Sequence, residues 1–445
     1  MNLQETFAAK INENGDISFN KVSDNNLLNV LFMTEYYQKH LSEVSIGTSD
    51  KEKLFSMFIR DPRYGLGRRD LGRVLMSQSG VSLDNIVKAG RWDDIFYIKY
   101  PSKESFYTTL DWVKTEIEKG NELLKKWMPR YSSKHLLLAR EIAKYWSMNK
   151  QQYGHFIKCN TTEHKLSQHN TGAIEFEHVP SLAMIKYAKR FATGADTKDR
   201  YAQYLLDVKA GKKDLKVSTT TVYDIYKNRQ SIDADLFFSK IEKIKGSWIP
   251  IVDTSASMVN ANDSFGKALS IGHYLAKCSS YAPNQVISFS SIPQLITLGT
   301  PSIISYSYYK SKVSNTDSQY QKEINSMYTG DCSNTDFSVV MNLLKNLTDM
   351  PEYLVVLTDC EFDMGSYQSK ENLMKLWKER GYTTKIIWWN LNVRNTTCPE
   401  MDTNGNLFMS GYSPFLLKYL QSGFNAEQFL DTLLKEYENC IRNSN

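Results

Sequence analysis

Residues 248–258, WIPIVDTSASM, decide the fold of the second half of this chain. The first residues are apolar and rich in β-branched side chains, and turn-forming residues follow at once, so we predict a buried strand that ends at Asp253. Asp253, Ser255 and Ser257 then alternate along the chain. In a tight loop, one carboxylate and two hydroxyls can converge as the hard oxygen ligands that Mg²⁺ prefers. A metal-free polar turn would give the same pattern, so other stretches must decide.

Two later stretches supply the missing context. Residues 331–337, DCSNTDF, place Thr335 and Asp336 before an apolar helical pattern, and residues 353–363, YLVVLTDCEFD, contain a second apolar run that ends at Asp359. The carboxyl ends of parallel strands meet at one rim of an open sheet. We therefore expect the Asp253 and Asp359 carboxylates to lie close together.

The order of these three stretches resembles the metal-ion-dependent adhesion site (MIDAS) of von Willebrand factor A domains. Asp253, Ser255 and Ser257 match its first motif, Thr335 its second and Asp359 its third. The resemblance implies a Mg²⁺ site made by these five residues, with Ca²⁺ or Mn²⁺ able to substitute. It also implies an α/β doubly wound, Rossmann-like domain. From residue 247 onward helical and strand patterns alternate, which independently predicts a largely parallel sheet with helices on both faces.

Length and composition limit the number of domains and the class of protein that this chain can form. A length of 445 residues exceeds what one core usually holds, and 41% hydrophobic with 23% charged residues is ordinary for a globular protein. The first residues lack the pattern of an export signal, no segment is long enough to span a bilayer, and the six cysteines form no C-x-x-C pair. We expect a cytoplasmic protein with reduced thiols and no membrane contact.

Residues 1–246 show apolar residues at helical spacing and no strand alternation of comparable strength. We predict an all-α, HEAT-like array of antiparallel helices over 1–246, followed by the α/β domain over 247–445. Asp24 is the expected N-cap of the first helix. The helix predicted near the C-terminus, over residues 426–443, is expected to dock its tail on the helical region.

Positive charge is concentrated in the helical region. Residues 1–247 contain 39 Lys and Arg against 30 Asp and Glu, and residues 51–150 alone contain 20 against 12. Guanidinium groups beside aromatic rings can bind phosphates and stack on bases. The candidate RNA-binding residues are Arg60, Arg63, Tyr64, Arg68, Arg69, Arg73 and Arg91. The alternative is structural: these arginines pair with Asp61, Asp70, Asp93 and Asp94 and hold helices together.

The segments RDPRYGLGRRD (residues 60–70) and GRWDD (residues 90–94), placed before an A domain, resemble TROVE proteins of the Ro-autoantigen type. In that family a ring of HEAT-like helices is closed by the A domain. The ring binds single-stranded RNA ends in its central hole and structured RNA on its basic outer face. The resemblance thus implies RNA partners for this chain.

Enzymatic function is not expected. The sequence has no P-loop, nucleophile elbow, H-E-x-x-H motif or Rossmann glycine triplet. Glu361 and Asp363 lie near Asp359, but a two-metal hydrolase needs more carboxylates than this motif provides. A zinc site at His155, Cys159, His164, His169 and His178 is disfavoured because the spacings fit no known finger.

Two functions remain after this elimination. The first is a non-catalytic RNA-binding protein with a divalent-metal site, related to Ro-type ribonucleoproteins. The second is a structural or protein-interaction component of a larger assembly, such as a virion, in which the metal captures an acidic residue of a protein partner. RNA that accompanies the purified protein would favour the first, and EDTA-sensitive association with a protein would favour the second.

Overall fold

The structure is a computed structural model that describes residues 9–11, 17–19, 23, 25–131, 134–167, 170–259, 263–300, 314, 317–328, 336–345, 347, 349–360, 362, 366–391, 406–411 and 426–442. The chain divides into two compact units, of which the first contains residues 1–44 and 217–436 and the second contains residues 45–216 and 437–445. Each unit is described separately below. In the part of the chain that is described, no helix combines the length and the apolar character needed to cross a bilayer.

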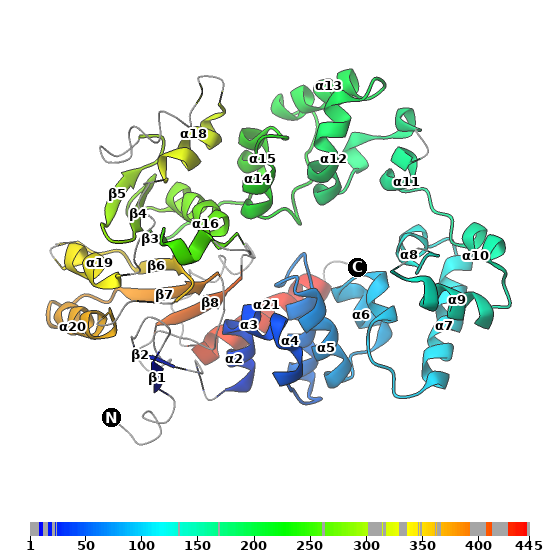
Figure 1. Ribbon diagram of the computed structural model, residues 1–445, viewed down its shortest axis with the longest axis horizontal. Helices are drawn as coiled ribbons and strands as arrows, with labels where there is room; N and C mark the ends of the chain where they lie inside the picture. Colours follow the sequence, from blue (N-terminus) through cyan, green and yellow to red (C-terminus); the bar gives the residue numbers. More distant parts are fainter. Residues whose placement is uncertain are drawn as a thin grey trace. The chain divides into compact units, whose positions relative to one another are not determined.

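Helices form the first half of the chain, as predicted (Figure 1). Several start at side-chain caps: Ser49 with Glu52 and Asn149 with Gln152 each form a capping box. The helices and 3₁₀ turns are α2 (Asn26–Phe32), α3 (Thr34–Lys39), η1 (Leu41–Glu43), α4 (Asp50–Arg60), α5 (Arg69–Ser79), α6 (Leu83–Ala89), η2 (Trp92–Phe96), α7 (Lys103–Glu118), α8 (Glu122–Trp127), α9 (Leu136–Tyr145), α10 (Lys150–Phe156), α11 (Thr162–Ser167), η3 (Thr171–Ala173), η4 (Phe176–His178), α12 (Ser181–Thr193), α13 (Lys198–Lys209), α14 (Val222–Asn228) and α15 (Ala234–Lys240).

Two details of the N-terminal prediction are wrong. The strands β1 (Ala9–Ile11) and β2 (Ile17–Phe19) pair antiparallel, so residues 1–246 are not all helical. Two short segments in which apolar and polar residues alternate, AKI and ISF, flank an Asn-Gly pair, which is a hairpin signal that the helical pattern obscured. The N-cap of α2 is Asn25, whose side chain accepts hydrogen bonds from the backbone N–H groups of Leu27 and Leu28, whereas Asp24 lies outside the described residues.

The first unit contains the predicted mostly parallel sheet, in the order β5-β4-β3-β6-β7-β8. The pairs β3–β4, β3–β6, β6–β7 and β7–β8 are parallel, and β4–β5 is antiparallel. Every residue of β3 and β6 is buried, as expected for central strands covered on both faces. The strands are β3 (Trp248–Asp253), β4 (Gln285–Phe289), β5 (Gln294–Thr297), β6 (Tyr353–Thr358), β7 (Lys385–Asn390) and β8 (Leu407–Ser410).

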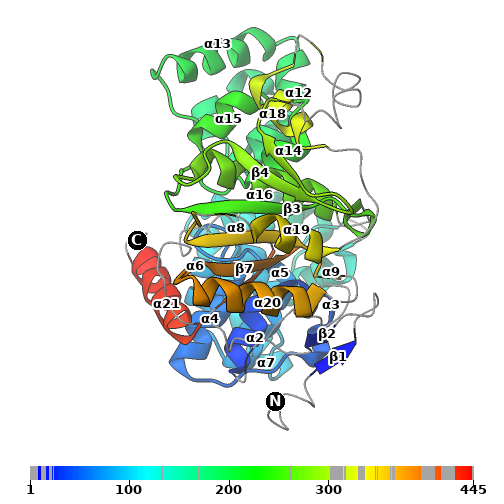
Figure 2. The ribbon, with the colours of Figure 1, turned by 90° about the vertical axis from the view of Figure 1, so that its left-hand side faces the viewer.

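Helices cover both faces of this sheet. On one face, α16 approaches so closely that a Cβ atom on Gly272 would lie 2.6 Å from the Val252 side chain. On the other face, Phe337 of α19 packs 5.3 Å from the ring of Trp388. Figure 2 shows α19 and α20 on the near side of the sheet and α16 beyond it. The remaining elements of this half are η5 (Ala256–Val259), α16 (Ser264–Cys278), α18 (Gln319–Ser326), α19 (Phe337–Leu344), α20 (Ser366–Glu379) and α21 (Ala426–Arg442).

The boundary between the two compact units does not coincide with the boundary between the helical region and the sheet. The helices α14 and α15 belong to the first unit with the sheet, although they precede the predicted division at residue 247. Tyr223 of α14 donates a hydrogen bond of 2.8 Å to the Asp263 carboxylate at the start of α16. Phe238 of α15 lies edge-on to His273 of α16, with ring centroids 4.8 Å apart. These contacts explain why the two helices stay with the α/β region.

The last helix, α21, contributes to both units. Phe429 stacks on Phe32 of α2 within the first unit, with ring centroids 6.3 Å apart. Tyr437 packs on Phe58 of α4 at 5.5 Å and donates a hydrogen bond of 3.3 Å to Asp61, both within the second unit. The predicted docking of this tail on the helical region is confirmed.

Candidate metal centre and nucleic-acid interface

The candidate metal centre lies where the sheet topology reverses. From β3 the chain moves outward to β4 and β5, then returns to β6 on the other side of β3 and continues to β7 and β8. The loops that follow β3 and β6 therefore diverge, and such a switch point is where open α/β sheets bind ligands. Asp253 is the last residue of β3, and Asp359 follows β6 directly. The sequence correctly predicted that both aspartates lie at the carboxyl ends of neighbouring parallel strands.

Hydrogen bonds through Asp253 link the two loops. Asp253 Oδ1 accepts from the backbone N–H of Ser255 at 2.9 Å, and Oδ2 accepts from Thr358 Oγ1 at 2.6 Å. The same Thr358 hydroxyl accepts from the N–H of Cys360 at 3.1 Å. Cys360 has a φ of 63°, a conformation uncommon for a residue with a side chain. Thr358 was not among the predicted site residues, although its place beside Asp359 at the strand end was a usable signal.

The donor atoms at this rim fit a divalent cation. Asp253 is 0% exposed and Asp359 is 1% exposed. Burial, and next the charge of Asp359, raise the pKa of Asp253, because two carboxylates close together in the interior repel each other. The hydroxyl oxygens of Ser255 and Ser257 lie 3.0 Å apart. Two carboxylates and two hydroxyls are the oxygen ligands that Mg²⁺ prefers, and a cation would offset the repulsion.

Thr335 and the disfavoured zinc site gain no support from the described residues. Thr335, the fifth predicted ligand, lies outside them, and Asp336 caps α19 by accepting from the N–H of Ser338 at 2.9 Å. Cys159, the thiol of the disfavoured zinc site, is buried and accepts a hydrogen bond of 3.6 Å from Arg130. Where the chain is described, no three His, Cys, Asp or Glu residues lie together as a metal-binding group.

A separate buried network joins α16 and α18. His273 Nε2 lies 2.7 Å from Glu323 Oε2, and Lys277 Nζ lies 3.0 Å from Glu323 Oε1. Burial lowers the pKa of His273, against the effect of Glu323. Burial alone would raise the pKa of Glu323, but hydrogen bonds from His273, Gln319 and Lys277 outweigh it and lower the pKa to about 2. The network therefore holds an ionised Glu323 beside a His273 that resists protonation.

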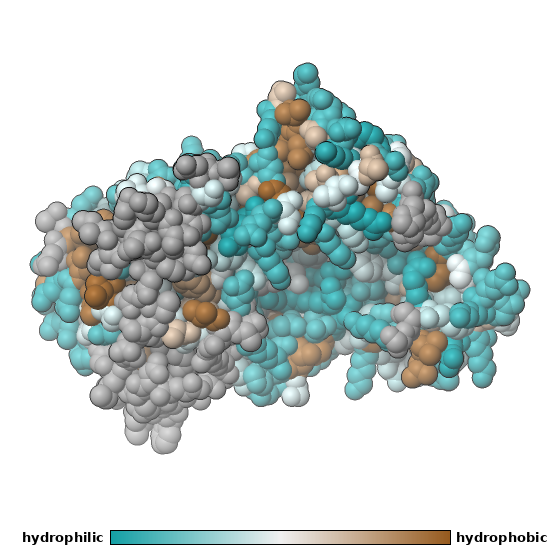
Figure 3. Space-filling model, turned by 45° about the horizontal axis from the view of Figure 1, so that its top comes forward, coloured by the Kyte–Doolittle hydropathy of each residue, from teal (hydrophilic) through white to brown (hydrophobic). Residues whose placement is uncertain are grey.

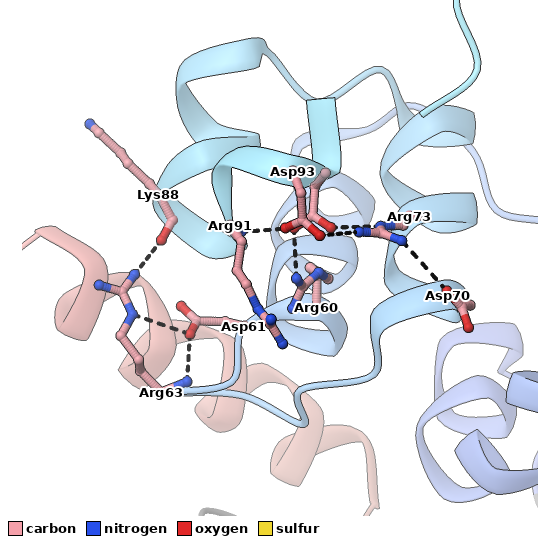
Figure 4. A network of polar contacts seen from close by, with 9 residues as sticks. Arg60, Asp61, Arg63, Asp70, Arg73, Lys88, Arg91 and Asp93 are labelled. Atoms are coloured by element: carbon pink, nitrogen blue, oxygen red, sulfur yellow. Dashed lines mark hydrogen bonds and ion pairs between the residues drawn. The ribbon is translucent and has the colours of Figure 1, made fainter. Parts of the chain in front are cut away.

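The predicted RNA-binding arginines surround buried carboxylates of the second unit (Figure 4). Arg60, at the end of α4, is 1% exposed, and its Nη2 lies 2.7 Å from Oδ2 of Asp94, which is 0% exposed. Arg73 of α5 lies 2.6 Å from Asp94, 3.0 Å from Asp93 and 3.7 Å from Asp70. Arg60 and Arg73 therefore fit the structural alternative, because both form ion pairs with aspartates.

Arg63 is also held by its neighbours. Its backbone N–H and that of Tyr64 donate to Asp61 Oδ1 at 2.7 and 3.3 Å, and its Nε lies 3.6 Å from the same oxygen. Its guanidinium also donates to the carbonyl of Lys88 (Figure 4). Asp61 is 0% exposed, and burial raises its pKa. The RDPRYG stretch is therefore an ordered turn, with Gly65 required because a Cβ there would lie 1.9 Å from the Phe58 carbonyl oxygen.

The GRWDD segment has a structural explanation as well. Asp94 Oδ2 accepts from the backbone N–H of Arg91 at 2.8 Å, which starts the turn η2. A Cβ atom on Gly90 would lie 2.1 Å from the same oxygen, so this position requires glycine. These two segments are the ones that carry the Ro-type resemblance. In this chain their aspartates and glycines position the arginines.

Arg91 and Arg69 form no ion pair within the described part of the chain. Arg69 is exposed at the start of α5, and Arg68 is half-buried at its N-cap. The Arg91 guanidinium lies 4.9 Å from the centre of the Trp127 ring. Burial, and next the charge of Arg69, lower the pKa of Arg91. Like charges gather here, which is the arrangement expected of an anion-binding surface.

Cations also lie over aromatic rings elsewhere in residues 51–150. Arg73 lies 4.3 Å from the centre of the Tyr97 ring, Lys103 lies 5.3 Å from Tyr107, and Lys126 lies 5.3 Å from Trp127. Tyr97 is 41% exposed. None of these aromatic residues was a candidate from the sequence, because helical spacing alone does not show which ring lies against a cation.

Comparisons with known proteins give family matches of unknown function. A domain of unknown function, DUF7788, matches residues 247–442, and another, DUF2828, matches residues 132–254. A search of curated protein sequences finds no match to this chain.

Among solved structures, the Deinococcus radiodurans RO (RSR) protein is similar over 94% of both chains, with a TM-score of 0.44 and 11% identity. Proximal thread matrix protein 1 from the mussel byssus is similar over 41% of this chain and 48% of its own, with a TM-score of 0.28 and 14% identity. Likeness at this level says nothing of function.

Proposed function

We propose that this protein is a non-catalytic RNA-binding protein in which residues 51–150 contact RNA and the α/β sheet holds a divalent metal ion. One observation carries the proposal: a segment with 20 basic and 12 acidic residues sets several of its cations over aromatic rings. Surfaces of this kind bind single-stranded nucleic acid, because cations attract phosphates and rings stack on bases.

The chemistry of this surface favours RNA over a folded protein as partner. The excess positive charge creates a field that attracts polyanions over a distance, and aromatic rings can stack on unpaired bases of any sequence. The Ro-type resemblance of residues 60–70 and 90–94 adds to the argument. Because Arg60, Arg63 and Arg73 are tied to carboxylates, we assign RNA contact to the exposed cations and rings around them.

The metal site offers a second candidate function, capture of a protein partner through an acidic side chain. Val259, at the end of η5, is 59% exposed, and Ile292, in the link after β4, is 54% exposed. Both residues follow strand ends at the rim that carries Asp253. A carboxylate of a protein partner would complete the coordination of the metal at this rim. The two functions use different units and can coexist.

RNA binding by the full-length protein tests the first function. Labelled single-stranded RNA and a hairpin are titrated at several salt concentrations, with heparin as a non-stacking polyanion control. We expect RNA to bind and its affinity to fall steeply as the salt concentration rises. Near physiological salt, RNA should displace heparin of equal charge, because only RNA can stack on the rings. Absence of RNA binding even at low salt overturns it. For the second function, immobilised protein with Mg²⁺ or EDTA is tested against peptides that contain one glutamate.

A further inference from the structure

Arg91 differs from three other arginines of its neighbourhood in its contacts with carboxylates. Arg60, Arg63 and Arg73 each have a carboxylate within 4 Å. In the part of the chain that the structure describes, the Arg91 side chain has no hydrogen bond and no ion pair, although its backbone N–H donates to Asp94. Figure 4 shows that this side chain extends away from Asp93.

The carboxylates near Arg91 already hold other arginines. Asp94 accepts from Arg73 and from the Arg91 backbone and is ion-paired with Arg60. Asp93 Oδ2 is ion-paired with Arg73, and Asp93 Oδ1 is buried without a hydrogen-bond partner. A turn of either carboxylate toward Arg91 would weaken the ion pairs of Arg60 or Arg73. Among the described residues, Arg91 therefore has no carboxylate of its own within ion-pair distance.

The position of the guanidinium is nevertheless well defined. It lies 4.9 Å from the centre of the Trp127 ring, and the side chain is half-buried. A cation–ring contact of this kind uses none of the five N–H donors of the guanidinium. Burial, and next the charge of Arg69, lower the pKa of Arg91, against the opposite effect of Asp93 and Asp94.

We propose that Arg91, held against Trp127 and assisted by Arg69, is a phosphate-binding site for one phosphodiester of a bound RNA strand. The assignment rests on the proposed RNA-binding function and adds the residue that makes the anchoring contact. A guanidinium matches two phosphate oxygens with two parallel N–H donors, which a lysine cannot do. The Trp92 and Trp112 rings, stacked 5.7 Å apart in the same unit, favour a nucleic acid over an acidic protein as the source of the anion.

The test uses the full-length protein and four variants: Arg91→Ala, Arg91→Lys, Arg69→Ala and the control Lys189→Ala. Lys189 is an exposed cation of α12, outside the basic segment 51–150. RNA affinity is measured across a salt series, and circular dichroism checks the fold. Arg91→Ala is expected to weaken RNA binding about tenfold or more and to reduce the salt slope by about 0.7, the value for one phosphate of a single strand. Arg91→Lys should recover only part of the affinity, and Lys189→Ala should change it little.

A second arm separates this inference from the proposed function. Inorganic pyrophosphate is titrated in a thermal-shift assay, which requires no RNA. Stabilisation of the wild type that Arg91→Ala and Arg91→Lys both reduce supports the phosphate site. RNA binding unchanged in Arg91→Ala overturns the inference and leaves the proposed function standing. Absence of both RNA binding and pyrophosphate stabilisation in the wild type overturns both. Stronger binding of polyglutamate than of RNA, lost in Arg91→Ala, overturns the phosphate assignment. If Arg91→Ala does not fold, Arg91→Lys decides.

Discussion

Replacement of Asp94 by Asn tests the packing on which the account of the arginines depends. The change keeps the size of the side chain and removes its charge. Asp94 is 0% exposed and lies 2.7 Å from Arg60, 2.6 Å from Arg73 and 2.8 Å from the Arg91 backbone nitrogen. Since Arg60 is 1% exposed, its charge would remain in the interior without a partner. Breaking a buried pair in this way costs about 3–5 kcal/mol.

The expected change in melting temperature follows from the size of the unit. The second unit contains residues 45–216 and 437–445. For a domain of roughly this size, 1 kcal/mol corresponds to about 2–4 °C, so Asp94→Asn should lower the melting temperature by about 6–20 °C. The matched control is Asp84→Asn on the exposed start of α6, where a change within about 0.5 kcal/mol is expected.

Thermal unfolding followed by circular dichroism gives the answer. A melting temperature of Asp94→Asn within 1 or 2 °C of the Asp84→Asn control would refute the reasoning. It would mean that Arg60 reaches solvent or another partner easily. The contrast between committed arginines and the uncompensated Arg91 would then lose its basis.

Three further predictions concern other parts of the molecule. Addition of Mg²⁺ should raise the melting temperature, with a stabilisation of about 2.7 kcal/mol at a hundredfold excess over its dissociation constant. Asp253→Ala should abolish this effect. A wild-type melting temperature that does not change with Mg²⁺ would contradict a functional metal site. As pH falls below about 6.5, the folded protein should lose stability because the pKa of buried His273 is lowered. The stability that ionised Glu323 contributes should be lost between about pH 4.5 and 2. His273→Gln should remove the loss below pH 6.5, and parallel pH profiles for the wild type and this variant would contradict the role of His273. Gly65→Ala should destabilise by about 1–3 kcal/mol or more, because the new Cβ would lie 1.9 Å from a backbone oxygen, whereas Gly154→Ala, with nothing within 4 Å, should be neutral or stabilising; equal melting temperatures would refute the turn geometry.

The α/β fold was predictable because its signals are local. Apolar runs such as residues 248–252 and 353–357 indicate buried strands. Because these strands alternate along the sequence with helices, parallel pairing is expected. The same logic placed Asp253 and Asp359 at one rim, since both lie at the carboxyl ends of strands that pair in parallel. Thr358 was missed because a strand residue that turns its hydroxyl to a neighbouring strand end carries no periodic signal of its own.

The roles of individual arginines were not predictable from composition. Arg60, Arg63 and Arg91 look equivalent in the sequence, yet one is buried in an ion pair, one is bound to a turn and one lies over Trp127. The contacts of Arg60 and Arg91 are with residues more than 30 positions away in the sequence, Asp94 and Trp127. For the same reason helical spacing identified α14 and α15 without showing that they pack with the sheet.

Exposed apolar residues do not point to an additional interface. Leu137 is 80% exposed, Leu206 is 58% exposed and Leu182 is 46% exposed, on three different helices. Figure 3 shows a face on which hydrophilic surface predominates and hydrophobic patches are scattered. Scattered apolar side chains are normal on protein surfaces, so the charged and aromatic surface of residues 51–150 remains the principal candidate for partner binding.

Salt-dependent RNA binding by the wild-type protein tests the central claim most directly. Fluorescence anisotropy with a labelled single-stranded RNA, repeated from about 50 to 200 mM salt, gives both affinity and the number of phosphates contacted. The account predicts binding at low salt and a logarithmic slope of several units that falls by about 0.7 in Arg91→Ala. A flat salt dependence, or no binding at the lowest salt, would contradict it.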